Sequence, residues 1–446
     1  MQTKLIKIIG IIGILALGGW WLLPRVITAV PSQIRYRLPE PLLALVTTPL
    51  PTALPAPAVN APPPTIFVPT LPATAVATPT LAPTLPSTFT PAPTHEAATA
   101  VATALPSPTN TPSPTPSPTP TLPTTVFLEG IENVPQLFNN CGAANLTTVL
   151  TYYGQEVDQR DVAAVVRPDY DDRNVSPWQL ASYVQTETAL EADTYIGGDV
   201  ELLKRLLAAG FPIIIEKGLV LEDHDGWMGH YLTLFGYEEA SQQFWTLDTF
   251  LGPFDSVGRL ESYEETMRYW RDFNYRFIVV YAPEQETAVH NILGSTYLDP
   301  LAMWQQAAER AQTAVNDSPA DAFAWFNLGS SLTHLGELTG EATYYETAAV
   351  AFDEARRIGL PWRMLWYQFE PYEAYLGNGR AADVLALTDA MITSEGGRYV
   401  EETFFYQGNA WLAQGDLDRA RRAYERALEV NPNFSPAQEA LAANGE

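Results

Sequence analysis

From about residue 41 to residue 124 the chain carries proline at a density that excludes both helix and sheet pairing. The runs TTPLPTALPAPAVNAPPPT and PSPTNTPSPTPSPTPTLPTT are typical of it. Such a segment has too few large apolar side chains to offset the entropy of ordering its backbone, and its prolines favour extended polyproline II. We predict a disordered Pro/Thr/Ser/Ala-rich linker over residues 26–125, which acts as a stalk. About 320 residues follow it, enough for two ordinary domains.

An apolar segment precedes this linker. Lys4 and Lys7 are followed by the uncharged run from Ile8 to Pro24, which would span about 25 Å as a helix at ~1.5 Å per residue. That is slightly short of a ~30 Å bilayer core, and the lysines favour an N-terminus on the inner side. We predict a transmembrane signal-anchor over residues 1–25, in a single-pass cell-membrane protein with extracytoplasmic C-terminal domains. The alternative is a cleaved signal peptide and a secreted protein.

The net charge of the chain is −26 at pH 7. Nucleic-acid binding needs clusters of basic residues, and so does docking on an anionic lipid surface. The charge therefore argues against nucleic acid as a partner and leaves one N-terminal helix as the predicted contact with the membrane. It does not identify a substrate.

Residues 126–285 change from helical to strand-like periodicity. The run AANLTTVLTYYG, which ends on Gly154, predicts one helix, and SPWQLASYVQTE predicts another, with Ser176 as N-cap and Pro177 in the first turn. Asp199 caps a third helix, VELLKRLLAAG. Beyond it, FPIIIEKG, HYLTLFGYEEASQQFWTLDT and YRFIVVYA predict strands. Helices followed by antiparallel strands indicate an α+β domain.

Residues 293–446 contain a repeat. The run YVEETFFYQGNAWLAQGDLDRARRAYERALEVNPN matches the tetratricopeptide motif along its length, and residues 362–391 look like a degenerate middle copy. In this motif small residues let two helices approach, and aromatic residues fill the space between them. We predict an all-α helical-repeat domain that binds a protein partner. The matching positions are Phe404, Gly408, Trp411, Ala420, Tyr424, Ala427 and Pro432 in the last copy, and Trp325, Leu328, Gly329, Leu332, Ala348, Phe352 and Ala355 in an earlier one.

Cys141 is the only cysteine of the chain. Exported proteins usually hold cysteines in disulfide pairs, and this residue has no second cysteine to pair with. It lies where a polar loop meets the first predicted helix, and the positive end of a helix dipole favours a thiolate. We predict a nucleophile; a small buried apolar residue is the alternative. Gln136, on the loop that enters the helix, is placed to offer its amide N–H₂ group to an oxyanion.

A cysteine nucleophile needs a base, and a third group that orients the base. His230 begins one predicted strand, in MGHYLTLFGY, and Asp248 ends the next, in FWTLDT. If these strands form a hairpin, Asp248 returns close to His230. Its carboxylate then accepts a hydrogen bond from one ring nitrogen while the other nitrogen faces the thiol. The alternatives are that His230 is an ordinary histidine without a catalytic role, and that Asp248 is simply one of the many acidic residues of this chain.

These residues together resemble the papain-like cysteine peptidases: Gln136, then Cys-Gly-Ala-Ala at a helix start, then Gly-His-Tyr on a strand, then Asp248. More narrowly, residues 126–283 resemble the family of double-glycine leader peptidases, which process bacteriocins. The resemblance implies Cys141 as nucleophile, His230 as general base, Asp248 as orienting residue and Gln136 as oxyanion donor. It implies no cofactor.

Two points qualify what the resemblance implies. The exporter members of that family belong to a transporter, for which this sequence shows no counterpart, so leader removal is not implied. Transglutaminase-like proteins use Cys, His and Asp in the same order, but Gly142 and Gln136 favour the peptidases.

Two further motifs have ordinary explanations. The run Glu222, Asp223, His224, Asp225 has the residue types of a hard-cation site without the spacing of a cation-binding loop. It is more typical of a solvated loop, and we predict no metal. The sequon Asn145-Leu146-Thr147 lies within the predicted helix after Cys141, where we expect a chance match.

The sequence thus predicts a membrane-anchored extracytoplasmic cysteine peptidase, which hydrolyses peptide bonds by thiol acyl transfer and whose helical repeats recruit a protein partner or substrate. Two alternatives stay open. One is a catalytically inactive papain-like surface protein that binds peptides or proteins. The other gives the repeats only a structural role, in which they cap the peptidase domain.

Overall fold

The computed structural model describes residues 53–57, 122–221, 226–394 and 396–444. The predicted anchor over residues 1–25, most of the predicted linker and the acidic run 222–225 lie outside the described residues. Within the described ranges, no helix combines the length and the apolar character needed to cross a bilayer.

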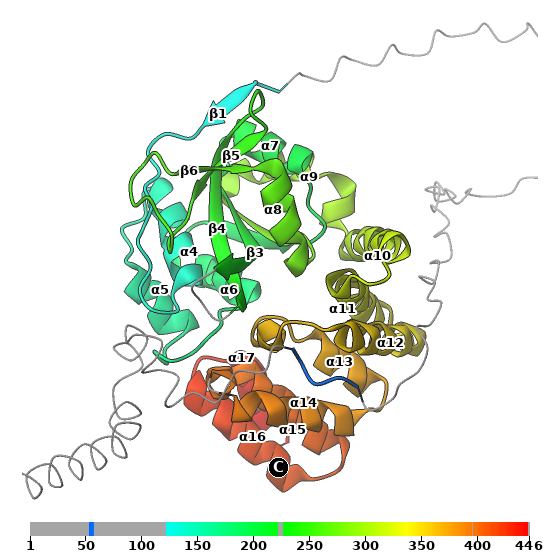
Figure 1. The fold of residues 1–446 in the computed structure, drawn as a ribbon. Helices are drawn as coiled ribbons and strands as arrows, with labels where there is room; N and C mark the ends of the chain where they lie inside the picture. Colours follow the sequence, from blue (N-terminus) through cyan, green and yellow to red (C-terminus); the bar gives the residue numbers. More distant parts are fainter. Residues whose placement is uncertain (1–52, 58–121, 222–225, 395, 445–446) are drawn as a thin grey trace, which may run out of the picture. The chain divides into compact units, whose positions relative to one another are not determined.

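Residues 125–281, the α+β region, are built on one antiparallel sheet of seven strands (Figure 1). The strand order is β2-β7-β3-β4-β5-β6, and β1 pairs with the C-terminal end of β4, at residues 236–238. β3 and β4 form its centre, because two further strands lie on each side of this pair, β7 and β2 beside β3, and β5 and β6 beside β4. The strands are β1 Thr125–Phe127, β2 Glu191–Tyr195, β3 Ile213–Leu221, β4 Gly226–Glu238, β5 Gln243–Leu247, β6 Arg259–Ser262 and β7 Phe277–Tyr281.

Helices cover both faces of this sheet. On one face, α4, α5 and α6 form a buried apolar cluster with side chains of β3, β4 and β7, among them Ile214, Tyr231 and Ile278. Successive strand residues point to opposite faces, so Phe277 points the other way, where its ring lies 6.3 Å from that of Trp270 in α8. The helices are α4 Cys141–Tyr152, α5 Gln159–Val166, α6 Pro177–Glu187, α7 Val200–Ala208 and α8 Tyr263–Trp270.

Residues 286–444, the helical region, consist of paired helices that follow the sheet. In the pair α11–α12 a Cβ atom on Gly329 would lie 2.8 Å from the ring of Phe352, and in α15–α16 one on Gly408 would lie 2.4 Å from Tyr424. The small motif residues therefore allow the close approach that the sequence predicts. The elements are α9 Glu286–Leu298, α10 Pro300–Asp317, α11 Ala322–Thr339, α12 Ala342–Ile358, η3 Trp362–Trp366, α13 Glu370–Gly377, α14 Ala381–Thr393, η4 Gly397–Tyr399, α15 Glu401–Ala413, α16 Leu417–Val430 and α17 Ser435–Ala443.

The structure differs from the sequence-based expectation in its less regular parts. Helices α5 and α8 and strands β1, β2 and β6 were not expected, because they are short and their partners lie far away in the sequence. The helical region starts at Glu286 rather than at residue 293, because α9 precedes the first motif copy. From His230 to Tyr237 every residue of β4 is buried, so this strand does not alternate: helices cover both of its faces.

One part of the predicted linker packs against the helical region. Leu54 is buried, and its backbone N–H donates to the carbonyl oxygen of Leu360 at 3.0 Å. The Nε of Arg356 donates to the carbonyl oxygen of Pro55 at 2.9 Å. Residues 53–57 are therefore not a free spacer, because a leucine in an extended, proline-flanked segment finds both an apolar site and backbone partners.

Polar side chains join the α+β region to the helical region. Ser176 at the start of α6 donates to Glu402 at 2.7 Å, and Gln179 donates to Glu401 at 3.1 Å. Arg276, at the entry to β7, pairs with Glu216 of β3 at 3.3 Å and with Glu370 of α13 at 3.2 Å. Buried carboxylates need such partners, so the contact between the two regions is specific as well as extensive.

Replacement of Arg276 by alanine is expected to destabilise the protein. It leaves Glu216, whose side chain is 2% exposed, without its cation, and it leaves Glu370, whose side chain is 8% exposed, with His334 at 3.7 Å as its remaining cationic partner. We expect a loss of about 3 kcal/mol in the free energy of unfolding, measured by urea denaturation of residues 125–446. The control is Arg160→Ala, whose side chain is 70% exposed and should cost about 0–1 kcal/mol. Equal effects of the two substitutions would contradict a structural role for the buried triad.

Candidate functional site

Cys141 is the first residue of α4 and is partly exposed. Burial alone would raise the pKa of its thiol. A hydrogen bond from His230, the positive charge of that ring and the backbone N–H groups of Tyr231 and Gly142 outweigh burial, and together they lower the pKa below its ordinary value. The site therefore favours a thiolate, the form in which cysteine is a nucleophile.

His230 lies on β4, beside the thiol. Its Nε2 atom is 3.1 Å from Oδ1 of Asp248, which leaves Nδ1 to face Cys141. Burial opposes charge on the ring, but the carboxylate of Asp248 and the thiol of Cys141 more than compensate and raise the pKa of His230 to about 10. A raised histidine pKa next to a lowered thiol pKa describes a thiolate–imidazolium pair.

Asp248 follows the last residue of β5, where the β4–β5 hairpin returns it to His230. Its Oδ1 atom also accepts hydrogen bonds from the backbone N–H groups of Phe250 at 2.9 Å and Leu251 at 2.8 Å. Burial raises the pKa of this carboxyl, whereas His230 and the two N–H groups lower it, and the balance lies well below the usual range. Asp248 therefore stays ionised and fixes the orientation of the imidazole ring.

Gln136 lies on the loop before α4 and is held at its backbone and at one side-chain atom. Its backbone N–H donates to the carbonyl oxygen of Thr249 at 2.8 Å, and its Oε1 accepts from the Thr249 hydroxyl at 2.9 Å. Because Oε1 is occupied in this way, the Nε2 amino group is the end left to donate. In the described part of the chain it has no hydrogen-bond partner.

The structure thus brings together all four residues that the sequence singled out. It also shows two residues that the sequence analysis missed as parts of the site. Asn145 of α4 is completely buried: its Nδ2 donates to the carbonyl oxygens of Cys141 and Tyr231, both at 2.9 Å, and its Oδ1 accepts from Thr233 at 2.7 Å. Its position also makes the sequon inaccessible.

Thr249 completes the connection. Its hydroxyl accepts from Nδ2 of Asn145 at 3.1 Å while donating to Gln136. Asn145 therefore links the nucleophile helix, the histidine strand and, through Thr249, the glutamine loop. The sequence feature that indicates this role is an asparagine placed among Ala143, Ala144 and Leu146 of a predicted helix, because a buried amide must find hydrogen-bond partners.

The described residues contain no group of three or more His, Cys, Asp or Glu side chains arranged to hold a metal ion. The acidic run 222–225, which carried the alternative of a cation site, is not among them.

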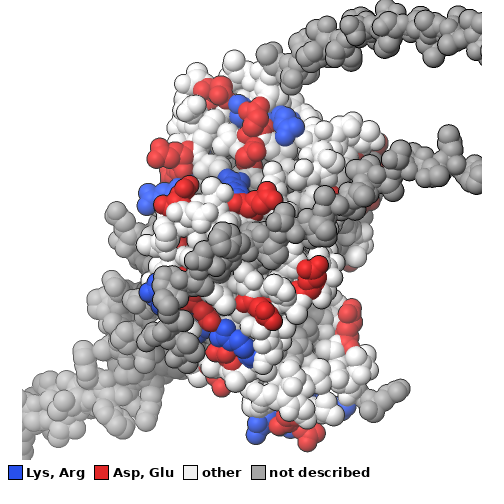
Figure 2. All heavy atoms as spheres, turned by 90° about the vertical axis from the view of Figure 1, so that its right-hand side faces the viewer, with Lys and Arg blue, Asp and Glu red and all other residues white. Residues whose placement is uncertain are grey.

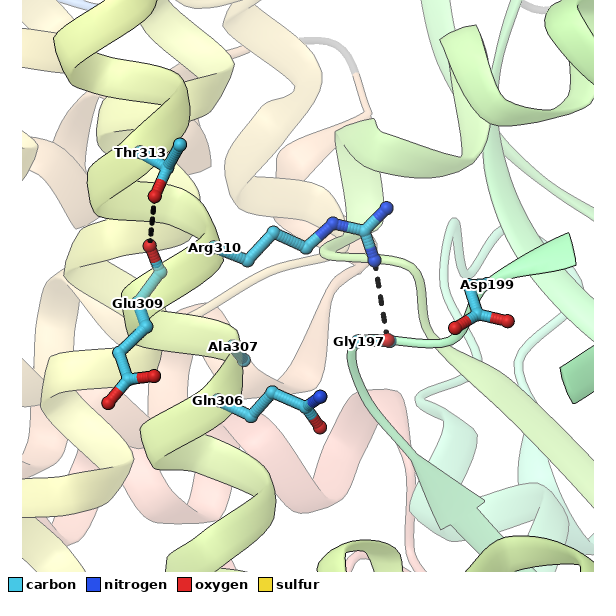
Figure 3. Close-up of a pocket in the computed structure, with 7 residues that line it drawn as sticks. All are labelled: Gly197, Asp199, Gln306, Ala307, Glu309, Arg310 and Thr313. Atoms are coloured by element: carbon cyan, nitrogen blue, oxygen red, sulfur yellow. Dashed lines mark hydrogen bonds between the residues drawn. The ribbon is translucent and has the colours of Figure 1, made fainter. Parts of the chain in front are cut away.

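A hollow of about 380 Å³ lies between α10 and the segment that enters α7 (Figure 3). Arg310 points across it and donates to the carbonyl oxygens of Gly197 at 3.3 Å and Gly198 at 2.9 Å. The carboxylate of Asp199 caps α7 through the N–H of Leu202 at 2.7 Å. The two bonds of Arg310 hold α10 against the α+β region.

The face of the molecule in Figure 2 shows lysines and arginines scattered among aspartates and glutamates, without a continuous basic patch over its described atoms. This distribution agrees with the acidic net charge of −26.

Comparison with protein families identifies the two regions. Residues 128–276 match the Peptidase C39 like family, and residues 303–356 and 401–434 match tetratricopeptide repeats. The resemblance seen in the sequence is therefore confirmed: a C39-like cysteine peptidase domain is followed by tetratricopeptide repeats. The expected succession of a mixed α and β domain and a helical domain is confirmed as well.

Solved structures of three peptidases are similar to the first of these regions. A Bacillus anthracis protein described as a C39-like peptidase shares 17% identity over 35% of this chain and 96% of its own, with a TM-score of 0.29. The peptidase domain of Streptococcus ComA, a bi-functional ABC transporter, shares 16% over 34% and 98%, with a TM-score of 0.27. A double glycine motif protease from an AMS/PCAT transporter, in complex with its leader peptide, shares 23% over 35% and 98%, with a TM-score of 0.25. No curated protein matches the chain.

The rate of alkylation of Cys141 should depend on pH through His230. In the wild-type protein the labelling midpoint should fall below the ordinary thiol value of about 8.5, because the imidazolium, which persists to about pH 10, stabilises the thiolate. In His230→Ala only burial and two backbone N–H groups remain, so the midpoint should rise. Iodoacetamide labelling of residues 125–446, followed by mass spectrometry, measures this, and each event reports Cys141 because no other cysteine is present.

The matched control is His290, a histidine of α9: His290→Ala should keep the wild-type midpoint of Cys141 labelling. A midpoint that is the same in wild type and His230→Ala would contradict the ion pair.

Proposed function

We propose that this protein is a membrane-anchored extracytoplasmic cysteine peptidase, which cleaves peptide bonds by thiol acyl transfer. The observation that carries the proposal is the connected line from Cys141 through His230 to Asp248, with the Nε2 group of Gln136 available beside it. A nucleophile, a base, an orienting carboxylate and an oxyanion donor are the parts that acyl transfer requires.

The geometry supports a two-step reaction. The Cys141 thiolate attacks the carbonyl carbon of a peptide bond, and the Nε2 group of Gln136, with the backbone N–H of Cys141, stabilises the negative charge on the carbonyl oxygen. His230, as imidazolium, gives its proton to the leaving amine. The same ring then takes a proton from water, which attacks the thioester, releases the acid and restores the thiolate–imidazolium pair. Asp248 stabilises the charged ring when it forms.

Residues outside this site support the proposed location. The apolar run from Ile8 to Pro24 behind Lys4 and Lys7 is the proposed anchor, and the proline-rich linker separates it from the peptidase domain. A single cysteine suits an oxidising compartment, since no second thiol is present to trap it in an intramolecular disulfide. We propose that the tetratricopeptide repeats bind the substrate or a protein partner of the peptidase.

Substitutions in the site should separate the roles of its residues. We expect Cys141→Ala and His230→Ala to abolish turnover, and Gln136→Ala to lower kcat about 10²–10³-fold because one oxyanion donor is lost. The control is Gln438→Ala, which removes an exposed glutamine on α17. Hydrolysis of 4-nitrophenyl acetate and of fluorescein-labelled casein by residues 125–446 provides the measurement.

Full turnover in His230→Ala would overturn the assignment of the base. A wild-type protein that has an ordinary thiol pKa and no turnover would instead favour the inactive papain-like module that binds peptides or proteins.

The membrane anchor makes a separate prediction. The full chain, expressed in a bacterial host, should stay with the membrane fraction after a carbonate wash, whereas a chain that starts at Thr125 should be soluble. Replacing Ile12 and Leu15 by lysine should release the full chain, because each charge at the bilayer centre costs about 2.5–3.5 kcal/mol. Recovery of a soluble protein trimmed near Ala29 would show a cleaved signal peptide instead.

A further inference from the structure

The helical region reaches the candidate active site through η3 and the residue after it, Tyr367. The ring of Tyr367 lies against Gly229, which immediately precedes His230: a Cβ atom on Gly229 would be 2.9 Å from Cγ and Cδ1 of that ring. Phe273 and Trp227 hold the ring from the α+β region, with centroids 6.1 Å and 5.9 Å away. A residue of the helical region therefore covers the backbone beside the base.

Tyr367 is also within electrostatic range of Cys141. Burial raises the pKa of its hydroxyl to about 12, and the groups that act on it include Cys141, Arg363, Arg173 and the backbone N–H of Gly229. The side chain is nevertheless only partly buried. It thus lies beside the strand that carries His230, with part of its surface open to solvent.

The same short segment touches the opposite wall of the site. The guanidinium of Arg173 lies 6.0 Å from the ring of Trp366, the last residue of η3, and 5.4 Å from the ring of Phe138, on the loop before Cys141. Two residues after Arg173, Val175 packs beside Gly142, where a Cβ atom would lie 3.4 Å from that of Val175. Trp366 and Tyr367 therefore contact both the segment that leads to Val175, beside Gly142, and the strand that carries His230.

The backbone next to Cys141 and next to His230 is closely packed: Tyr367 and Phe273 occupy the space beside Gly229, and Tyr231 and Val175 the space beside Gly142. Because Cys141 precedes Gly142 and interacts with His230, which follows Gly229, we expect a substrate carbonyl at Cys141 to pass near the ring of Tyr367. We propose that Tyr367 is a specificity-determining residue of the cysteine site, supplied by the helical region, which limits the size of the group that approaches Cys141 from that side. This inference rests on the proposed peptidase function and assigns to the repeats a direct part in substrate selection.

Two classes of thiol reagent test the proposal on residues 125–446. Iodoacetamide is small and should reach Cys141 in every variant. Acetyl-Ala-Ala and acetyl-Phe-Phe chloromethyl ketones place small or large side chains beside the reacting carbon. We expect the wild-type protein to react faster with the alanine reagent. In Tyr367→Ala the ratio of the alanine rate to the phenylalanine rate should fall at least about tenfold, because the excluded volume is gone.

Two further variants make the result specific. Tyr367→Phe keeps the ring and should keep the wild-type ratio, and Tyr399→Ala, which removes a tyrosine of η4, should also leave it unchanged. If Tyr367→Ala does not fold, the same ratio of reagent rates is measured on Tyr367→Leu, which keeps an apolar side chain without the ring and should also show the fall.

An unchanged ratio in a folded Tyr367→Ala or Tyr367→Leu protein would overturn this inference. The iodoacetamide pH profile separates it from the proposed function. An ordinary thiol profile in the wild type contradicts the peptidase site itself, whereas a low-pKa profile with unchanged selectivity contradicts only the role of Tyr367.

Discussion

The hydrogen bond between His230 and Asp248 depends on the pairing of β4 with β5, and the rest of the site is arranged around it. Asp248 is buried, so its charge needs more than one partner; the N–H groups of Phe250 and Leu251 supply two and His230 a third. This environment fixes the imidazole ring with Nδ1 toward the thiol. The raised pKa of His230 and the lowered pKa of Cys141 follow from that single orientation.

A second buried group, the amide of Asn145, connects the parts that the hairpin does not reach. It bonds to the carbonyl oxygens of Cys141 and Tyr231, to the hydroxyl of Thr233 and, through Thr249, to Gln136. An unsatisfied amide at this depth would be costly, so each of these bonds constrains the position of a different segment. Cys141, the strand that carries His230, and Gln136 consequently hold their places relative to one another through one side chain.

The helical region is bound to the peptidase domain by buried polar pairs as well as by apolar contacts. Ser176 with Glu402 and Arg276 with Glu370 join elements that lie far apart in the sequence. This arrangement agrees with the alternative that the repeats cap the peptidase domain, and Tyr367 places a residue of the helical region next to Gly229, on the strand that carries His230. Recruitment and support are therefore compatible in one structure, because the region that packs on the domain also contacts this strand.

The sequence by itself determined what depends on local pattern and on residue type. Ser176 and Asp199 cap α6 and α7, Gly154 follows the end of α4, and the tetratricopeptide positions recur at fixed spacing, so these elements could be predicted. Cys141, His230, Asp248 and Gln136 were identifiable because their chemistry and order are distinctive. Only the tertiary structure decided the pairing of β2, β6 and β7, the hydrogen bonds of Asn145 and the approach of Tyr367 to Gly229. These contacts join residues tens to more than a hundred positions apart, and no local periodicity or motif records which distant surfaces will be buried against each other.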